Sequence, residues 1–263
     1  MKYLILCFGL MLGMPSWAAE SAAELLACMQ ANVPDALRVQ ELEFETSNAE
    51  GVIGVIKGRL YLEREQVAAG DRLVRAMLRL DAPAKLSGAA YLIREKDGEK
   101  MDGMYVYLPS VKRVRRVTGS FADSGLMGTS FSYADFRMLQ NSFDGAELSV
   151  EPSEQIEKRA VHRLLVKPSE ARSKGGGYGN ARLWVDKQTC VLLKAEFEQD
   201  GVVRKRLSVP VDALKQLDTR WYAAVVEMRD EKERIRTTLR MRSLNVPEEL
   251  SGGYFDPKTF YQR

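Results

Sequence analysis

The chain has 263 residues, of which 45% are hydrophobic, 29% charged and 8% aromatic. This composition is typical of a globular protein with an apolar core, and it excludes an intrinsically disordered or collagen-like chain. The 39 Lys and Arg residues and the 36 Asp and Glu residues leave a net charge of only +3, which argues against a dedicated nucleic-acid-binding protein. The single histidine, His162, excludes histidine-rich metal sites.

Residues 1–18 predict a secretory signal peptide. Lys2 supplies the positive charge, Tyr3–Met14 forms an uncharged apolar run, and Ser16 and Ala18 then form a small-x-small pattern. The apolar run is too short to span a bilayer as a mature helix. We therefore expect cleavage after Ala18 and export of residues 19–263, a length that suits one large all-β domain or two small ones.

Two cysteines, Cys28 and Cys190, follow the expected cleavage site. An even number of cysteines in an exported protein favours one disulfide. The bridge would close a loop of about 160 residues, which the loop-entropy argument rates at about 5 kcal/mol. The alternative is that the two residues are separate buried thiols.

The first expected element of the mature chain is a helix over Ala19–Met29. Ser21 is its predicted N-cap, and Glu24 follows three residues later, as in a capping box. Pro34 ends this region, and a second short helical turn is predicted over Asp35–Gln40.

From Leu42 onward, apolar residues recur with a period of two. The clearest expected strands are Gly51–Glu63, Arg72–Leu80, Ile235–Met241 and Met101–Leu108, the last of which is apolar on both parities. Polar residues occupy the other parity in most of them, which is typical of antiparallel strands with one face in water. The sequence shows no alternation of strands and helices, so a parallel sheet is not expected. We predict a mainly β fold (α+β) of about ten or eleven antiparallel strands.

One segment interrupts the strands. Thr118–Thr129 is rich in glycine and serine, and Phe131–Asn141 then shows helical spacing. The glycine-rich part also carries Phe121, Leu126 and Met127, which need a cavity, a ligand or the sheet to bury against.

Two other segments have alternative interpretations. The glycine-rich Lys174–Asn180 resembles a phosphate-cradling loop, but no Lys-Ser/Thr pair follows it, and a flexible hairpin loop is the better interpretation. The basic cluster Lys112–Arg116 fits an anionic headgroup or partner. Its alternation with valines is also typical of an exposed strand face.

The sequence gives no support for an enzyme. Ser130 and Asp135 place a hydroxyl near a carboxylate, but nothing in the spacing links them to His162. For Asp135 and Asp144, helix capping or a solvated loop is the default interpretation. The chain has no Cys-x-x-Cys, no His-Glu-x-x-His and no paired-carboxylate motif. We therefore expect no catalytic residues, no metal site and no cofactor.

The strand "MYVYLPSVKRVRR" (Met104–Arg116), followed by "LMGTSFSYADF" (Leu126–Phe136), resembles the outer membrane lipoprotein-sorting family, the LolA-like periplasmic proteins. Arg72–Pro83 and Leu183–Phe197 are similar to that family as well. The resemblance covers Cys28–Leu244 and is closer to the branch often associated with RND/MMPL-type transporters than to the dedicated LolA carrier.

This resemblance implies a single domain with an incomplete, strongly curved antiparallel β-barrel, whose helices plug or lid an apolar cavity. It also implies a periplasmic carrier that holds acyl chains of a lipid or lipoprotein and moves them towards the outer membrane. The implied partners are those acyl chains and an inner-membrane RND/MMPL-type transporter, with no nucleic acid and a monomeric state. The alternative is an envelope-sensing module resembling the anti-sigma-factor regulator class.

We expect the cavity wall and its cover to come from two groups of apolar residues. The wall group is Leu60, Leu62, Leu78, Leu80, Met104 and Val106, and the cover group, within residues 118–141, is Leu126, Met127, Phe131 and Phe136. Ordinary barrel core is the alternative for each of them. A hydrocarbon chain of about 14 CH₂ groups costs about 11 kcal/mol to keep in water, at about 0.8 kcal/mol per CH₂, and a carrier must supply this from such a wall.

Overall fold

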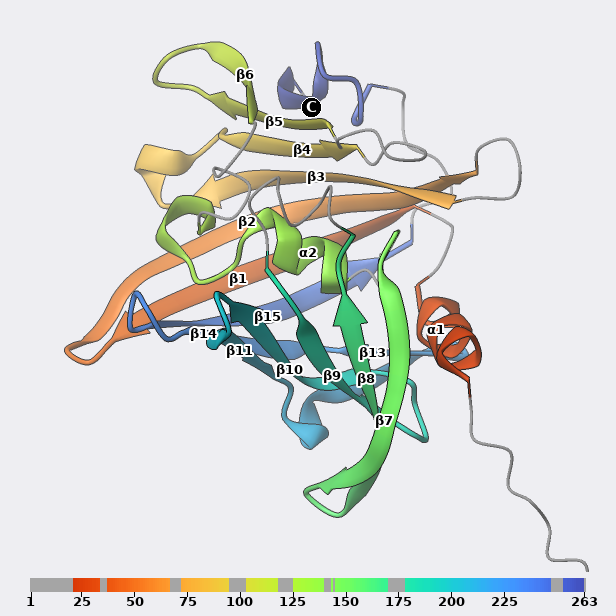
Figure 1. The fold of residues 1–263 in the computed structure, drawn as a ribbon. Coiled ribbons are helices and arrows are strands. Elements are labelled where there is room, and N and C mark those ends of the chain that lie inside the picture. The colour runs from red at the N-terminus through yellow and green to blue at the C-terminus, as the bar shows by residue number, and fades with distance from the viewer. Residues whose placement is uncertain are drawn as a thin grey trace, which may run out of the picture.

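The period-two pattern of the chain builds one large, curved antiparallel sheet, with two helices beside it (Figure 1). The structure is a computed structural model that describes residues 21–33, 37–66, 72–94, 103–117, 125–139, 143, 145–169, 178–246 and 253–262. The predicted signal peptide, residues 1–18, lies outside the described residues.

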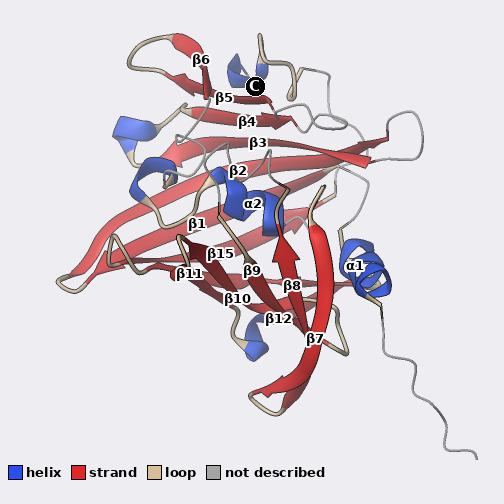
Figure 2. Ribbon diagram, in the orientation of Figure 1, coloured by secondary structure: helices blue, strands red, loops and turns tan. Residues whose placement is uncertain are grey.

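The strands are β1 (Arg38–Asn48), β2 (Gly51–Gln66), β3 (Arg72–Ala82), β4 (Ala90–Arg94), β5 (Gly103–Leu108), β6 (Arg113–Val117), β7 (Glu147–Ile156), β8 (Arg159–Lys167), β9 (Ala181–Asp186), β10 (Leu192–Gln199), β11 (Val202–Ser208), β12 (Leu214–Leu217), β13 (Arg220–Ala223), β14 (Val225–Asp230) and β15 (Ile235–Asn245). The helices are α1 (Ala22–Ala31) and α2 (Tyr133–Leu139), with single 3₁₀ turns η2 (Ala84–Leu86), η4 (Leu126–Gly128), η5 (Val211–Ala213) and η6 (Phe260–Gln262). Figure 2 shows how strongly strands dominate.

The described part of the chain forms a 13-stranded sheet in the order β6-β5-β4-β3-β2-β1-β15-β14-β11-β10-β9-β8-β7, and β12 and β13 form a separate hairpin. The predicted number of ten or eleven strands is therefore wrong. Short strands such as β12 and β13, with four residues each, are too brief to show an alternation. The sheet is not closed, because β6 and β7 are its two edges. The mainly β, antiparallel and strongly curved character is confirmed.

The middle of the sheet joins distant parts of the chain. β1 pairs with β2 on one side and with β15 on the other, so that Phe44 faces Ile56 and Leu239. The helical turn predicted for Asp35–Gln40 is wrong for its last residues, because Arg38–Gln40 begin β1. The hydrogen-bonded register with β2 extends the strand over these residues, which outweighs their local helical propensity.

Register shifts help to curve the sheet. One lies between Lys57 and Gly58, where β2 pairs with β3, and a bulge of this kind bends its strand. A Cβ atom at Gly58 would collide with the carbonyl oxygen of Arg79, so the two backbones approach closely only because this residue is glycine.

The concave face of the sheet carries the main core. Leu42 and Phe44 of β1, Leu60 and Leu62 of β2 and Leu80 of β3 are all buried there, as their parity predicts. The expectation fails at the tip of the β1–β2 hairpin. There Val52, which shares the parity of Leu60 and Leu62, is 62% exposed because the hairpin extends beyond the core.

The outer face of β2–β5 is also covered, which the prediction of one wet face missed. The C-terminal segment, residues 253–262, packs there, with Phe260 fully buried against a cluster that includes Tyr61, Met77 and Leu92. Tyr261 stacks on Tyr107 with ring centroids 4.1 Å apart. This cover explains why β5 is apolar on both parities, and burying Phe260 contributes about 2–3 kcal/mol.

α1 is fastened at both ends. Ser21 and Glu24 form the predicted capping box, and Leu25 and Met29 are buried. The disulfide between Cys28 and Cys190 is confirmed and joins the helix to the turn before β10. α1 lies beside β7, whereas α2 lies within the concavity of the sheet (Figure 1). None of the described helices has the length and apolar character needed to cross a membrane.

Candidate functional site

An apolar cavity of about 30 Å³ lies between the concave face of the sheet and the segment that carries α2. β2 to β5 provide the wall, and Leu126 and Phe136 close it from the opposite side. The residues that line it are Leu60, Leu62, Val74, Ala76, Leu78, Tyr91, Ile93, Met104, Leu126 and Phe136. Among the described residues that line it, the only polar side chain is the phenol of Tyr91, and burial raises the pKa of that group.

A second cavity, of about 130 Å³, lies on the other side of Phe136. Leu60 and Phe136 line both cavities, so the ring of Phe136 stands at the boundary between them. The second cavity has an apolar part, which includes Leu42 and Leu239, and a polar part, which includes Arg38 and Gln40 from β1.

The structure brings together most of the residues predicted to bind a ligand. Leu60, Leu62, Leu78, Met104, Leu126 and Phe136 line the smaller cavity. Four others lie outside its lining: Leu80 and Phe131 are fully buried in the core, Met127 packs against the core from the turn before α2, and Val106 is half-buried in β5. Whether any of the ten binds a ligand stays a prediction.

An aromatic cluster fixes the position of Phe136. Its ring contacts those of Phe44 in β1 and Phe131, with centroids 6.2 Å and 5.7 Å apart, and Phe44 and Phe131 are 6.1 Å apart. The first and last of these pairs are edge-to-face arrangements, as aromatic rings prefer. The cover is therefore packed against β1 at the centre of the sheet.

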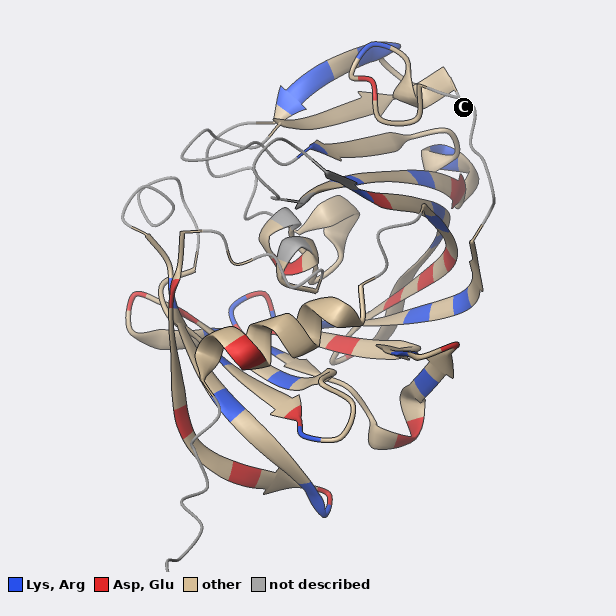
Figure 3. Ribbon diagram, turned by 90° about the vertical axis from the view of Figure 1, so that its right-hand side faces the viewer, with Lys and Arg blue, Asp and Glu red and all other residues tan. Residues whose placement is uncertain are grey.

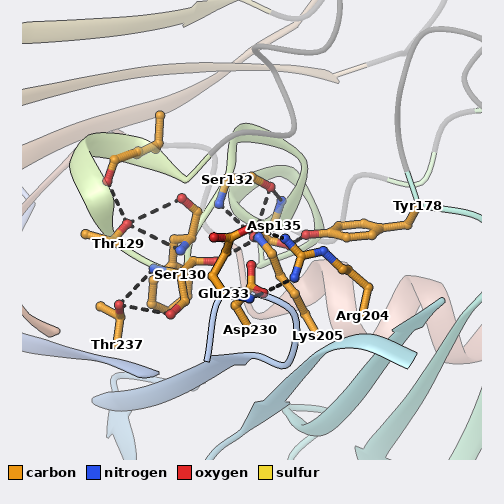
Figure 4. A network of polar contacts seen from close by, with 12 residues as sticks. Thr129, Ser130, Ser132, Asp135, Tyr178, Arg204, Lys205, Asp230, Glu233 and Thr237 are labelled. Atoms are coloured by element: carbon orange, nitrogen blue, oxygen red, sulfur yellow. Dashed lines mark hydrogen bonds and ion pairs between the residues drawn. The ribbon is translucent and has the colours of Figure 1, made fainter. Parts of the chain in front are cut away.

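The N-terminal turn of α2 is held by a buried polar network (Figure 4). The backbone N–H of Ser132 donates to Asp135 Oδ2 at 2.7 Å, and the N–H of Asp135 donates back to Ser132 Oγ at 3.4 Å. These reciprocal bonds resemble a capping box, so the capping role expected for Asp135 is confirmed. Its alternative, a solvated loop, is wrong because Asp135 is fully buried.

Two side chains from other elements complete this network. Lys205 of β11, only 3% exposed, donates to Asp135 Oδ2 at 2.9 Å and to the carbonyl oxygen of Ser130 at 2.7 Å. Tyr178 donates its hydroxyl to Asp135 Oδ1 at 2.8 Å. We call Asp135, Lys205 and Tyr178 the α2 anchor, because they tie the helix to the sheet far from β2–β5 (Figure 4).

The turn before α2 is fastened separately. The backbone N–H of Ser130 donates to Thr237 Oγ1 at 2.8 Å, and Thr129 Oγ1 donates to the carbonyl of Leu126 at 2.8 Å. Met127 and Gly128 have positive φ angles of 53° and 79°, so the chain reverses sharply here. The turn thereby directs Leu126 into the smaller cavity.

The polar groups around α2 bond to one another and to the backbone. Asp135 pairs with Lys205, and Ser130 Oγ bonds with Thr237 and the carbonyl of Ile235. His162 lies in β8, opposite Val185 of β9. In the part of the chain that the structure describes, no group of three or more His, Cys, Asp or Glu residues is placed to hold a metal.

Of the remaining sequence interpretations, the basic cluster lies at an edge of the sheet. Lys112–Arg116 form the turn and edge strand β6, where the four cations are exposed (Figure 3). Asp144 and most of the glycine-rich Lys174–Asn180 segment lie outside the described residues, as do Phe121 and the other residues of 118–124.

Three residues of the site were not singled out from the sequence, namely Lys205, Tyr178 and Arg38. Strand parity carried a signal for two of them. Lys205 precedes the buried Leu207 by two residues, and Arg38 precedes the inward Gln40 and Leu42 by two and four. A cation on the apolar parity of a strand therefore marks a buried charge.

Comparisons with known proteins agree with this architecture. A family model described as an uncharacterized protein matches residues 73–262. No curated protein sequence matches this chain.

Three solved structures share the fold over nearly the whole chain. A DUF1329 family protein from Desulfovibrio piger has a TM-score of 0.80 and 22% identity, covering 89% of this chain and 95% of its own. A protein domain from Vibrio parahaemolyticus, named for outer membrane lipoprotein sorting, has a TM-score of 0.78 and 24% identity, covering 92% and 100%. A LolA superfamily protein from Nitrosomonas europaea has a TM-score of 0.69 and 15% identity, covering 90% and 98%.

At these identities the three structures show the fold, and the family match spans well over half of the sequence. The chain therefore belongs to the family of this model, and its fold is similar to those of the LolA superfamily protein and the lipoprotein-sorting domain.

Proposed function

We propose that this protein is a periplasmic carrier that binds acyl chains of a lipid or lipoprotein between the β2–β5 wall and α2. The observation that carries the proposal is the apolar cavity there, which is closed by a short helix rather than by a second sheet. Proteins usually keep an apolar ligand out of water in a concave apolar site with a movable cover.

Loading requires α2 to move. The cavities of about 30 and 130 Å³ are smaller than the roughly 300–1,000 Å³ of typical ligand pockets. Phe136 lies at their boundary, so displacing its ring would join them into one chamber. An acyl chain of about 14 CH₂ groups supplies up to about 11 kcal/mol of burial free energy to offset this displacement.

The α2 anchor defines how the helix opens in this proposal. Asp135 lies in the first turn and is held by Lys205, whereas Phe136 and Leu139 face the cavities. We expect the helix to pivot about the buried ion pair, because breaking that pair would leave a charge unpaired in the core. Opening then needs only the apolar contacts of Phe136 and Leu126 to be replaced by ligand.

The direction of transport is part of the proposal. The resemblance of Met104–Arg116 to the transporter-associated branch supports movement towards the outer membrane together with an RND/MMPL-type transporter. Cross-linking of the protein to such a transporter in intact cells tests this part, independently of ligand binding.

The central test is native mass spectrometry of the protein purified from periplasm. We expect a lipid adduct on the wild type and its loss in Leu126→Asp, because a carboxylate would enter the apolar cavity. Val202→Asp is the matched control, since Val202 is 66% exposed at the β10–β11 turn, and it should retain the adduct. A folded Leu126→Asp variant that carries the wild-type amount of lipid would overturn the proposal.

A further inference from the structure

Arg38 is a buried cation with unsatisfied donors. It is 6% exposed, and its Nε and Nη2 atoms are buried without any hydrogen-bond partner. It lies on the concave face of β1 and lines the 130 Å³ cavity. Buried guanidinium groups are normally paired with carboxylate or phosphate, so this arrangement requires an explanation.

The charged neighbours of Arg38 are themselves cations. Burial, with the nearby positive charges of Arg64 and Arg220, lowers the pKa of Arg38 to about 10. The guanidinium is thus still protonated at neutral pH. Within the described part of the chain, no carboxylate pairs with it. An uncompensated buried charge is strongly unfavourable, and an anion that reaches it gains a charge-assisted, bidentate contact.

The lining of the cavity changes from polar to apolar along β1, as an amphiphilic ligand requires. Arg38, Gln40, Leu42 and Phe44 follow one another on the concave face of β1 at every second position, from charged to polar to apolar. At about 3.3 Å per residue, the backbone positions of Arg38 and Leu42 are about 13 Å apart. The apolar end reaches Phe136, the boundary with the smaller cavity.

We propose that Arg38 binds the anionic headgroup of the ligand, a phosphate or carboxylate, while the hydrocarbon runs along β1 towards Phe136. This inference rests on the proposed function and narrows its ligand class to anionic amphiphiles. Arg115 of β6 provides the contrast: it is an exposed arginine on an edge strand, and the inference gives it no role in the selectivity.

The test compares three probes: dodecyl phosphate, dodecanol and inorganic phosphate, each titrated by calorimetry. We expect the wild type to bind dodecyl phosphate about tenfold or more tightly than dodecanol. Arg38→Gln should bind the two equally while retaining dodecanol, and Arg38→Lys should keep part of the preference. Arg115→Gln should behave as wild type.

The probes distinguish a failure of the proposed function from a failure of the headgroup assignment to Arg38. If neither amphiphile binds the wild type, the proposed function fails. If both bind equally to the wild type, or if a folded Arg38→Gln keeps the full preference, only the assignment to Arg38 fails. Binding of inorganic phosphate as tight as that of dodecyl phosphate would show a site for a free anion and overturn the assignment to an amphiphile.

Discussion

The two ends of the sheet have the same alternation of inward and outward residues but differ in what packs against the inward ones. β7–β11 form what we call the fixed region: their inward side chains, such as Leu164, Leu183 and Phe197, are fully buried, and Tyr178 packs on Phe197 with ring centroids 4.8 Å apart. β2–β5 form the cavity region, whose inward leucines face α2 across a void. In the proposed function, this difference makes the cavity region the surface that binds the ligand.

The fixed region also differs from the opposite edge of the sheet, β6, in its ion pairs. On the fixed region, Arg159, Arg163 and Arg182 are each paired with carboxylates. On the edge next to the cavity region, the cations of β6 have no ion pair with any described residue. α2 lies over the cavity region, yet its anchor residue Lys205 belongs to β11, so the opening of α2 that we propose would leave the fixed region intact.

The largest effect should come from removing the disulfide that fastens α1 near the fixed region. Cys28 and Cys190 are 162 residues apart in sequence, and closing such a loop contributes about 5 kcal/mol by the entropy argument. Cys28→Ala combined with Cys190→Ala should lower the free energy of unfolding in urea by about 2–5 kcal/mol. A loss below about 1 kcal/mol would mean that α1 does not restrain the fixed region.

Breaking the α2 anchor should have an effect of similar size. Asp135→Ala leaves the ammonium of Lys205 buried and unpaired, which should cost about 3–5 kcal/mol in urea unfolding. The double variant Asp135→Leu with Lys205→Met removes both charges and should recover most of that loss. If the double variant is as unstable as Asp135→Ala, hydrogen bonds to Ser132 and Tyr178 hold the helix instead of the ion pair.

Within the fixed region, Asp186 offers a pH-dependent test. Burial raises the pKa of Asp186, but hydrogen bonds from Arg159, at 2.6 and 2.7 Å, and from Thr189 outweigh it, so the pKa lies below its ordinary value. A depressed folded-state pKa stabilises the fold above the unfolded pKa near 4, and this is lost as the pH falls through the folded value. Asp186→Asn should cost about 2–3 kcal/mol at pH 7, with a smaller difference from wild type below pH 4. A difference independent of pH would contradict this origin.

Removing an exposed ion pair of the cavity region, the counterpart of Arg159–Asp186, should have the smallest effect. Arg59 donates to Asp81 through two bonds of 3.1 Å, but both side chains are about two-fifths exposed. Asp81→Asn should therefore cost less than about 1 kcal/mol in the same unfolding measurement. A cost equal to that of Asp186→Asn would remove the distinction between the two regions.

The sequence predicted those features that depend on local pattern. The capping box at Ser21 and the inward parity of Leu60 and Leu62 follow from spacing alone. The burial of Leu126 follows from its apolar side chain in a glycine-rich segment. The strand count and the covered outer face of β2–β5 did not follow, because Phe260 and its neighbours approach that face from the other end of the chain. Strand parity says which residues share a face, but it does not say what packs against that face.

The cavity and the anchor were predictable to different degrees. Six expected ligand-binding residues meet around one void because they share the concave face and its cover. The pair Asp135–Lys205 was not foreseen, because it joins residues 70 positions apart and depends on the strand order β14-β11-β10. Arg38 was missed because the sequence predicted a helical turn over Asp35–Gln40, whereas the register with β2 places Arg38 in a strand.

The most direct measurement is photo-cross-linking with a fatty acid that carries a reactive group near its methyl end, followed by peptide mapping. Labels should fall on β2, β3, β5 and α2, in peptides that contain Leu60, Leu78, Met104 or Phe136, and Leu126→Asp should abolish them. Labels confined to exposed apolar positions, such as Val52 at the hairpin tip or Val202, would show that hydrocarbon does not enter beneath α2.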